Sequence, residues 1–328
     1  MLNQATGNSK MATAQHIKAL IKSHFADEGE RFTTLALQMA AHEAKLGHTN
    51  LADEIRKLVD KSKTKVRALK PFNQDLEGLV LEIHPNEKLV DLIVSDFLKE
   101  RLKRILNEYK QKEKLKQHGL ENRRKILLTG PPGTGKTMTA SIVSKELHLP
   151  LFVILMDKMV TKFMGETSAK LRMVFDIITE RRGVYLFDEF DAIGGERGKD
   201  NDVGEMRRVL NSFLQFIERD ESDSIIVAAT NNLKLLDQAL FRRFDDVIHY
   251  HLPTTQEIQL LLENRLGRFK GNFKLEGIAS IAKNLSHAEI SHACLDAIKE
   301  AILSDKKKVD KELLTRMIND RVSAYKIN

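Results

Sequence analysis

The chain has 328 residues, with 53 Lys and Arg against 46 Asp and Glu, 42% hydrophobic residues and a single cysteine. This length is enough for two or three small domains, and the composition excludes collagen-like, low-complexity and mucin-like chains. The sequence contains no run of about 18 apolar residues and no secretory signal at its N-terminus, so we expect a cytoplasmic protein without a membrane span. Cys294 excludes a disulfide framework and is expected to be a buried small hydrophobe.

The net charge of +7 is concentrated in one stretch of the chain. Residues 99–125 hold eleven Lys and Arg against four Glu, an excess equal to the charge of the whole chain. Apolar residues there recur with a helical period, which predicts one amphipathic helix over 94–117. They are Phe97, Leu98, Leu102, Ile105, Leu106 and Tyr109. The basic face is either solvated or a contact for a polyanion such as nucleic acid.

Residues 1–68 predict a small domain of three helices. Apolar spacing places the first helix at 13–25 and the second after Asp27, a candidate N-cap, with its end at Gly47. The third begins near Thr49 and precedes a polar run at 61–65. Such a domain has a small core and no chemistry of its own, so we expect a docking element.

Beyond residue 78, apolar strands alternate with helices. The strand candidates lie at 79–83, 125–129, 151–155, 184–187 and 225–229. This alternation predicts a mostly parallel α/β sheet. After Pro253 the pattern is helical only, at 255–266, 276–284, 287–303 and 309–324. The predicted domains are therefore a helical domain at 1–68, an α/β domain at 69–252 and a helical domain at 253–328.

A glycine-rich motif, GPPGTGKT, lies between the strand at 125–129 and an apolar helix. It matches the pattern of a phosphate-binding loop, in which consecutive backbone N–H groups surround a phosphate, a lysine reaches the β- and γ-phosphates, and a hydroxyl binds Mg²⁺. We therefore expect this segment to bind ATP and Mg²⁺, with Lys136 and Thr137 in those two roles. The residues of the motif and its first helical turn are Gly130, Pro131, Pro132, Gly133, Thr134, Gly135, Lys136, Thr137 and Met138.

Two carboxylates follow the apolar strand at 184–187. Asp188 is expected to emerge at the strand's carboxyl end beside the phosphate loop and to hold Mg²⁺ with Thr137. Glu189 points elsewhere and can polarise a water for attack on the γ-phosphate. These residues together predict an enzyme that hydrolyses ATP.

With these motifs, the chain resembles the AAA family of ATPases over residues 80–325. The segment from Ser224 to Asn231, followed by LDQALFRRFD at 236–245, is similar to the second region of homology of that family. The resemblance implies an α/β P-loop NTPase with a parallel sheet flanked by helices, a C-terminal α-helical lid and, here, an N-terminal helical domain. It also implies a homo-oligomeric ring, expected to be a hexamer.

The same resemblance gives roles to three further polar residues. Asn231 matches the sensor-1 residue, which helps to orient the attacking water. Arg242 and Arg243 match the arginine fingers, which reach the nucleotide bound by the neighbouring subunit. Many family members have Pro-Gly between the two arginines, and this sequence does not, so either arginine is a candidate for the finger.

Substrate contacts are implied by position within the family. Lys162, Phe163 and Met164 lie where AAA translocases carry the loop that lines the central pore, and Phe163 matches the aromatic that grips a polypeptide. The segment 194–204 is placed like a second pore loop. Near the lid, the sequence LSHAEI at 285–290 resembles the segment at the nucleotide base, with His287 and Ala288 as candidate contacts and His287 in place of a glycine.

The function implied is remodelling, unfolding or translocation of a protein substrate by an ATP-driven ring. The N-terminal domain is placed where such machines bind partners. The order of domains is similar to that of membrane-remodelling members with a helical-hairpin interaction domain. It is also similar to that of ATPases that accompany subtilisin-like serine proteases in bacterial two-component defence systems. The alternative is a DNA-acting module that uses the basic helix at 94–117, which predicts nucleic acid binding with a steep salt dependence.

Overall fold

The structure is a computed structural model that describes residues 18–23, 29–65, 78–159, 164–193, 200–232 and 241–324. The chain divides into two compact units, residues 1–73 and 74–328. The division into three domains at residues 68 and 252 stays a prediction.

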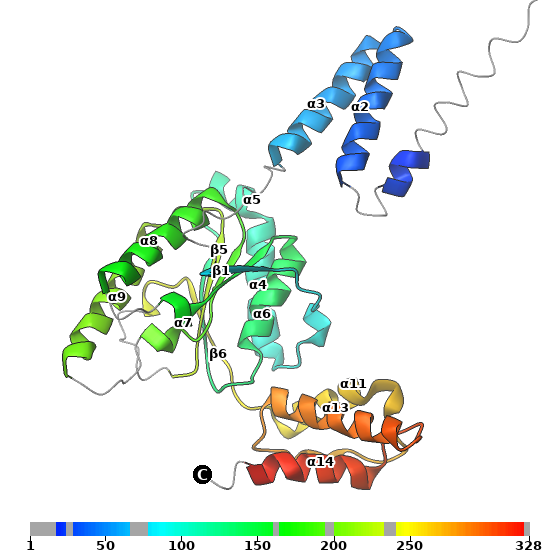
Figure 1. The fold of residues 1–328 in the computed structure, drawn as a ribbon, viewed down its shortest axis with the longest axis vertical. Coiled ribbons are helices and arrows are strands. Elements are labelled where there is room, and N and C mark those ends of the chain that lie inside the picture. Colours follow the sequence, from blue (N-terminus) through cyan, green and yellow to red (C-terminus); the bar gives the residue numbers. More distant parts are fainter. Residues whose placement is uncertain are drawn as a thin grey trace, which may run out of the picture. The chain divides into compact units, whose positions relative to one another are not determined.

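In the first unit, two antiparallel helices pack against each other (Figure 1). They are α2, Gly29–Lys45, and α3, Thr49–Lys65, and residues 18–23 are also helical. Gly47 has a φ of +88° in the tight turn between α2 and α3, a conformation that glycine adopts without steric penalty. Ala40 and Ala52 are buried, and such small side chains allow close packing of the two helices. The proposed cap Asp27 lies outside the described residues.

The second unit is built on a six-stranded sheet with the order β1-β3-β4-β5-β2-β6. The strands are β1 Val80–Ile83, β2 Lys125–Thr129, β3 Leu151–Ile154, β4 Val184–Phe187, β5 Ile225–Thr230 and β6 Asp246–His249. All neighbours are parallel except β1, which pairs antiparallel with β3 at the edge. The strands β4 and β5 are buried at every position, as expected for strands covered on both faces. The predicted mostly parallel sheet is confirmed.

Helices cover both faces of this sheet (Figure 1). On one face lie α4 Asp96–Lys110, α5 Lys112–Gln117 and α6 Lys136–Leu147. On the other lie α7 Met156–Met159, α8 Met164–Glu180 and α9 Asp200–Arg219, and short 3-10 turns occur at Leu89–Asp91 and Phe190–Ile193. The core between β2 and the α4–α6 face includes Leu102, Ile105 and Ile142, all almost fully buried.

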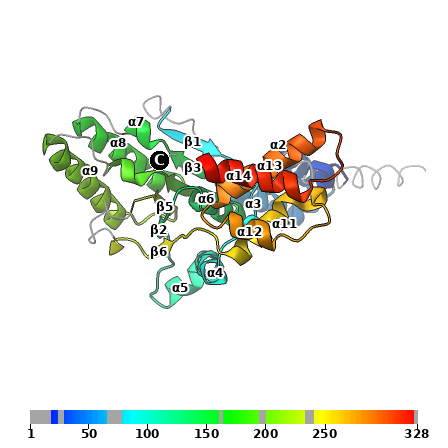
Figure 2. The same cartoon turned by 90° about the horizontal axis from the view of Figure 1, so that it is seen from below.

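The C-terminal region is helical, as predicted, and has its own core (Figure 2). Its helices are α11 Thr255–Leu266, α12 Glu276–Ile281, α13 His287–Leu303 and α14 Lys311–Ala324, with a 3-10 turn at Gly267–Phe269. Cys294 is fully buried in this core, which confirms its expected role as a small apolar residue. Burial also raises the pKa of the Cys294 thiol to about 12, so it stays protonated and unreactive.

The prediction of one amphipathic helix over 94–117 is wrong in two respects. The helix breaks at Gln111, which has φ −106° and ψ 20°, and α5 begins at Lys112. The break lies beside Asp223, whose backbone carbonyl accepts a hydrogen bond of 2.7 Å from Tyr109 and whose carboxylate pairs with Lys112. Phe97, assigned to the apolar stripe, is instead 72% exposed.

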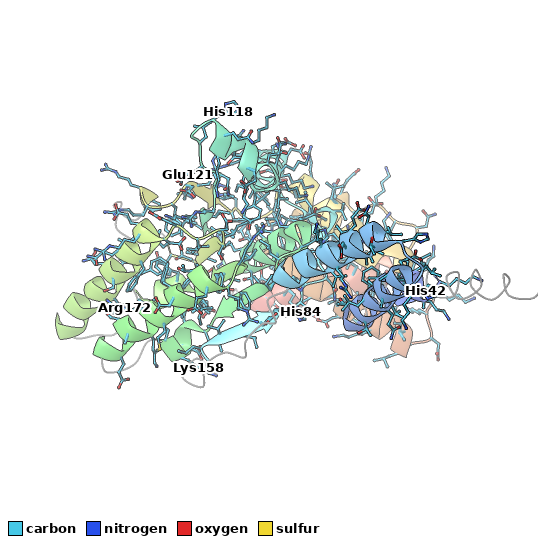
Figure 3. The ribbon with its side chains drawn as sticks, turned by 90° about the horizontal axis from the view of Figure 1, so that it is seen from above. His42, His84, His118, Glu121, Lys158 and Arg172 are labelled. Carbon is cyan, nitrogen blue, oxygen red and sulfur yellow. The ribbon has the colours of Figure 1, made fainter. Side chains whose placement is uncertain are left out.

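Many of the basic residues at 99–125 form ion pairs within the fold. Arg101 pairs with Asp246, Arg123 with Glu108, and Arg124 with the buried Asp220. Figure 3 shows His118 and Glu121, which follow α5, on the opposite side of the molecule from Lys158 of α7 and Arg172 of α8. The basic stretch therefore lies away from α8, the helix that follows the predicted pore segment. Part of its charge is neutralised by ion pairs within the fold.

Candidate nucleotide-binding site

The loop between β2 and α6 has the backbone conformation that its glycines allow. Gly130, Gly133 and Gly135 have φ values of +138°, +70° and +103°. A Cβ at Gly130 would lie 2.2 Å from the carbonyl oxygen of Tyr250, and a Cβ at Gly133 would lie 2.6 Å from the Ser286 hydroxyl oxygen. The loop therefore approaches the chain after β6 on one side and the start of α13 on the other, and glycine is required at both positions.

Lys136 opens α6 and its side chain is buried under the loop. Its Nζ donates hydrogen bonds of 2.8 Å to the carbonyl oxygens of Gly130 and Pro131. Burial lowers the pKa of Lys136, and the nearby carboxylates of Asp188 and Asp191 oppose this shift. A cation held in this way at a helix start, within reach of backbone N–H groups, fits a phosphate-binding site.

Thr137 and Asp188 meet at the edge of the loop. The Thr137 hydroxyl donates a hydrogen bond of 2.6 Å to Asp188 Oδ2, which joins the start of α6 to the end of β4. Both side chains offer hard oxygen atoms, the ligands that Mg²⁺ prefers, and proteins usually hold this ion with one or two side chains and substrate phosphates.

Glu189 and Asn231 follow two neighbouring strands at the same edge of the sheet. Glu189 is exposed, and its backbone has a φ of +51°, an uncommon value for a residue with a side chain. Its N–H donates to Asp188 Oδ1 at 2.9 Å, which fixes the turn. The N–H of Asn231 donates to Asp191 Oδ1 at 3.2 Å, so this third carboxylate ties the end of β5 to the turn after β4.

Aromatic residues hold the segment that carries Asp188 and Glu189. Phe187 and Phe190 stand immediately before and after this pair, both fully buried, and each contacts the ring of Phe213 in α9, at centroid distances of 5.0 and 4.4 Å. Phe175 of α8 stacks on Phe187 at 5.9 Å and meets Phe213 edge-on. We call Phe175, Phe187, Phe190 and Phe213 the aromatic cluster; it joins α8 and α9 to the turn after β4.

The lid reaches the phosphate loop at the start of α13. The N–H of Ala288 donates to the carbonyl oxygen of Gly133 at 3.0 Å. Ser286 caps α13 by accepting from the Glu289 N–H, and the Glu289 carboxylate accepts from the Ser286 N–H in return. This capping box fixes the chain direction at His287, which follows the cap.

These groups surround one pocket of about 420 Å³. It brings together most of the candidate residues, namely Pro132, Gly133, Thr134, Gly135, Lys136, Thr137, Met138, Asp188, Glu189, Asn231, His287 and Ala288. Gly130 and Pro131 form the start of the loop but do not line this pocket. The size suits a nucleotide.

The pocket also includes residues that the sequence did not single out. They are Asp91, Leu92, Ile93, Leu261, Arg265, Ser291 and His292. Leu92 and Ile93 belong to the segment before α4 and Leu261 to α11, and they add an apolar wall to the pocket. In the sequence, Leu92, Ile93 and Leu261 are ordinary apolar residues, and no motif sets them apart.

Arg242 and Arg243 lie away from this pocket. Arg243 is half-buried and pairs with Glu218 of α9, whereas Arg242 is exposed and forms no ion pair with another described residue. Of the pore candidates, Lys162 and Phe163 lie outside the described residues, and Met164 is the first residue of α8. Most of the second predicted pore segment also lies outside them.

His249 makes a structural contact within the sheet. His249 ends β6, and its Nδ1 shares a hydrogen bond of 2.7 Å with the hydroxyl of Thr129 at the end of β2. His251 follows the strand rather than lying within it.

In the described part of the chain, no helix is both long and apolar enough to cross a bilayer.

Comparisons with known proteins identify the family of this chain. The model of the ATPase family associated with various cellular activities (AAA) matches residues 126–252. The uncharacterized AAA family ATPase y4kL of Sinorhizobium fredii is 32% identical over 94% of this chain and 96% of its own length. A proteasome-activating nucleotidase of Sulfurisphaera tokodaii is 33% identical over 61% of this chain, and an ATP-dependent zinc metalloprotease FtsH of Parabacteroides distasonis is 34% identical over 65%.

The lengths of these relatives differ. This chain spans nearly all of the first relative, but about half of the nucleotidase (54%) and a third of the metalloprotease (33%). With the family match and a full-length relative in agreement, the chain belongs to the AAA family of ATPases.

Proposed function

We propose that this ATPase forms a ring and uses ATP hydrolysis to unfold, remodel or translocate a protein substrate. The observation that carries this proposal is the aromatic cluster, because it links Asp188 and Glu189 directly to α8 and α9. These two helices follow the two segments predicted to line the pore. A change at the turn after β4 during hydrolysis is thereby coupled to substrate-contacting loops.

In the proposed site, Lys136 and the loop N–H groups bind the phosphates. Thr137 and Asp188 hold Mg²⁺, which neutralises phosphate charge when bound. Glu189 accepts a proton from the attacking water, and Asn231 orients that water. The positions of these side chains around one pocket support the assignment.

We assign the role of arginine finger to Arg242. Arg243 is already paired with Glu218 of its own subunit, whereas Arg242 is exposed and free of such a pair in the described structure. An exposed guanidinium outside its own nucleotide pocket is suited to reach the γ-phosphate of a neighbouring subunit. The site would then be complete only in an oligomer, which we propose to be a hexamer.

A protein substrate is supported by the relatives. Two of them are named for activating the proteasome and for ATP-dependent proteolysis. We propose that the helices α2 and α3 bind a partner protein and that this partner is a subtilisin-like serine protease of a bacterial defence system. Leu51 and Leu58 of α3 are 47% and 68% exposed. Exposed apolar side chains of this kind can form the binding surface for a partner protein.

The alternative, a DNA-acting module, rests on the basic residues at 99–125. The ion pairs of Arg101, Arg123 and Arg124 reduce the charge available to a polyanion. The exposed residues Lys103 and Lys116 also pair with carboxylates. We therefore favour the protein substrate.

A trapping experiment tests this choice. The Glu189→Gln variant is tagged, held in ATP and Mg²⁺, and purified with and without nuclease treatment, with Lys136→Ala as the matched control that cannot hold ATP productively. We expect proteins enriched with Glu189→Gln over the control, bound through nuclease treatment. Loss of the bound material on nuclease digestion would instead move the function to nucleic acid.

Phe163→Ala tests the pulling mechanism separately. We expect ATP turnover to persist and work on the trapped substrate to stop, because only the grip on the polypeptide is lost. Full processing by this variant would exclude a pore role for Phe163.

A further inference from the structure

Arg242 and Arg243 lie in a tight turn directly before β6. The N–H of Phe244 donates to the carbonyl oxygen of Phe241 at 3.4 Å, so the two arginines are the central residues of this turn. We call residues 241–244 the arginine turn. Phe244 is buried, whereas Arg242 is exposed. An exposed arginine that reaches a neighbouring subunit depends on how firmly its own subunit holds the backbone that carries it.

Asp245 joins the end of the arginine turn to the start of β2. Its Oδ2 accepts hydrogen bonds of 2.8 Å from the backbone N–H groups of both Arg124 and Lys125. Its own N–H donates to the carbonyl oxygen of Lys125 at 2.8 Å. Regular pairing of β6 with β2 begins one residue later, at Asp246 and Ile126, so the Asp245 side chain extends the attachment beyond the paired strands. One residue thus makes three hydrogen bonds to two consecutive residues that are distant in sequence.

Arg124, which receives this attachment, is itself fixed in the fold. Its guanidinium pairs with the buried carboxylate of Asp220 and also donates to the backbone carbonyl oxygen of Asp220. Its backbone N–H is one of the two that Asp245 binds. On the other side of Asp245, Asp246 pairs with Arg101 of α4. Two arginines of the basic stretch therefore support the chain that follows the arginine turn.

The arginine turn depends on Asp245 for its attachment to the sheet. Within the described part of the chain, residues 241–244 make no hydrogen bond to a strand, and Arg243 pairs instead with Glu218 of α9. The strand β2, in contrast, is paired along its length with β5 and β6. Neither Asp245 nor the arginine turn lines the nucleotide pocket of its own chain. Loss of the Asp245 carboxylate therefore loosens the arginine turn, while β2 and the phosphate loop after it keep their other supports.

We propose that Asp245 positions the arginine turn and is thereby required for ATP hydrolysis in the neighbouring subunit, although it contacts no nucleotide itself. The inference rests on the proposed role of Arg242 as the arginine finger and adds the residue that holds this finger in place. An arginine stabilises the charge on the transferring phosphoryl group only from a defined position. Asp245 is therefore a positioning residue, and its loss lowers turnover rather than affinity for ATP.

Substitution of Asp245 separates these two quantities. The affinity for a non-hydrolysable ATP analogue and the maximal rate of ATP turnover are measured with full-length Asp245→Ala. We expect a dissociation constant within about twofold of the wild type. We expect a turnover rate about 10²-fold lower, which is the effect of misplacing a reacting group by about 1 Å. Wild-type turnover in Asp245→Ala would overturn the inference.

Two further variants control for stability. Asp310→Ala removes another carboxylate that accepts from a backbone N–H, that of Leu313 at 2.8 Å, at a position that does not line the pocket, so affinity and turnover should equal those of the wild type. Asp245→Asn keeps one acceptor oxygen, so its turnover should lie between those of Asp245→Ala and the wild type. Asp245 is exposed, so its substitution leaves no cavity in the core. Should Asp245→Ala nevertheless fail to fold, Asp245→Asn takes its place, and wild-type turnover in that variant would overturn the inference.

Mixed assemblies distinguish a positioning role towards the neighbouring subunit from a defect in the variant's own site. Asp245→Ala subunits are combined with Glu189→Gln subunits, which keep ATP and an intact arginine turn but have no turnover of their own. Where a Glu189→Gln subunit supplies the arginine, the site of an Asp245→Ala subunit is complete. Turnover per Asp245→Ala subunit should therefore rise above its value in the unmixed assembly. Arg242→Ala, mixed in the same way, is the reference and should show the same gain.

The mixtures also separate this inference from the function on which it rests. A gain in both mixtures supports the positioning role of Asp245. A gain with Arg242→Ala but none with Asp245→Ala would overturn the inference, because the defect would then lie in the variant's own site. No gain in either mixture would overturn the proposed arginine finger, and the inference with it.

Discussion

The Thr137 hydroxyl donates a hydrogen bond of 2.6 Å to the Asp188 carboxylate across 51 residues of sequence. This bond brings the first turn of α6 and the carboxyl end of β4 to one point beside Lys136. Two oxygen-bearing side chains at such a point are what a Mg²⁺ ion bound to phosphates needs from the protein.

Removing either partner should therefore uncouple nucleotide binding from Mg²⁺. For Thr137→Ala and Asp188→Asn we expect the gain in ATP affinity on adding Mg²⁺ to be largely lost, while affinity in EDTA changes little. Titration of ATP with and without Mg²⁺ measures this. Thr315→Ala in α14, whose hydroxyl bonds only to its own helix, is the matched control and should behave as wild type.

The glycine at position 133 should be essential for contact with the lid. Gly133→Ala places a Cβ 2.6 Å from the Ser286 hydroxyl oxygen and 3.1 Å from the Ala288 Cβ, in addition to the strain of a positive φ. We expect a marked loss of nucleotide affinity. Gly119→Ala has a similar φ of +69° but nothing within 4 Å, so it isolates the backbone strain, about 1–3 kcal/mol. Equal affinity in both variants would show that the contact with α13 has no role in binding.

Substitutions of Arg242 and Arg243 should have different effects on ATP turnover and on stability. In an assembly made only of Arg242→Ala subunits, we expect ATP turnover to fall on the order of 10³-fold, because the charge that develops in the transition state loses its arginine partner. Arg243→Ala should cost at most about 1 kcal/mol of stability through its ion pair with the half-exposed Glu218. Glu218→Gln breaks the same pair and should match Arg243→Ala. A loss of turnover in Arg243→Ala alone would reverse the assignment.

The aromatic cluster should matter for catalysis beyond stability. Phe213 is fully buried, and Phe213→Leu should destabilise the fold while it loosens the turn that carries Asp188 and Glu189. We expect ATP hydrolysis to fall more than ATP affinity. Phe97→Leu, at a position 72% exposed, should leave both unchanged and change stability by less than about 0.5 kcal/mol.

Stability should depend on pH through His287. Burial lowers the pKa of this group in the folded chain, so the unfolded chain takes up the proton first as the pH falls through about 6.5. Protonation therefore favours unfolding, and stability is lost towards acid. We expect the melting temperature of His287→Phe to fall less between pH 7.5 and 5.5 than that of the wild type. His118→Gln, at an exposed position, should follow the wild type.

The chemistry of the site could be predicted from sequence because it depends on local patterns. A glycine-rich loop after a buried strand and two carboxylates after another are set by adjacent residues, and parallel strands bring their carboxyl ends together. The wall of Leu92, Ile93 and Leu261 could not be predicted, since each is an ordinary apolar residue placed by tertiary packing. The break at Gln111 lies beside Asp223, a residue distant in sequence, and no local pattern marks it. The pairing of Arg243 with Glu218 likewise appears only in the folded chain.

Glu189 is proposed to act as the base for ATP hydrolysis in the pocket formed by the loop of Lys136. The most direct measurement is ATP binding and ATP turnover of the wild type, Glu189→Gln and Lys136→Ala, side by side. We expect Glu189→Gln to bind ATP as the wild type does while its turnover falls about 10²- to 10⁴-fold, and Lys136→Ala to lose binding. Wild-type turnover in Glu189→Gln would contradict the assignment of Glu189 as the base. Undiminished ATP binding in Lys136→Ala would contradict the assignment of Lys136 to the phosphates.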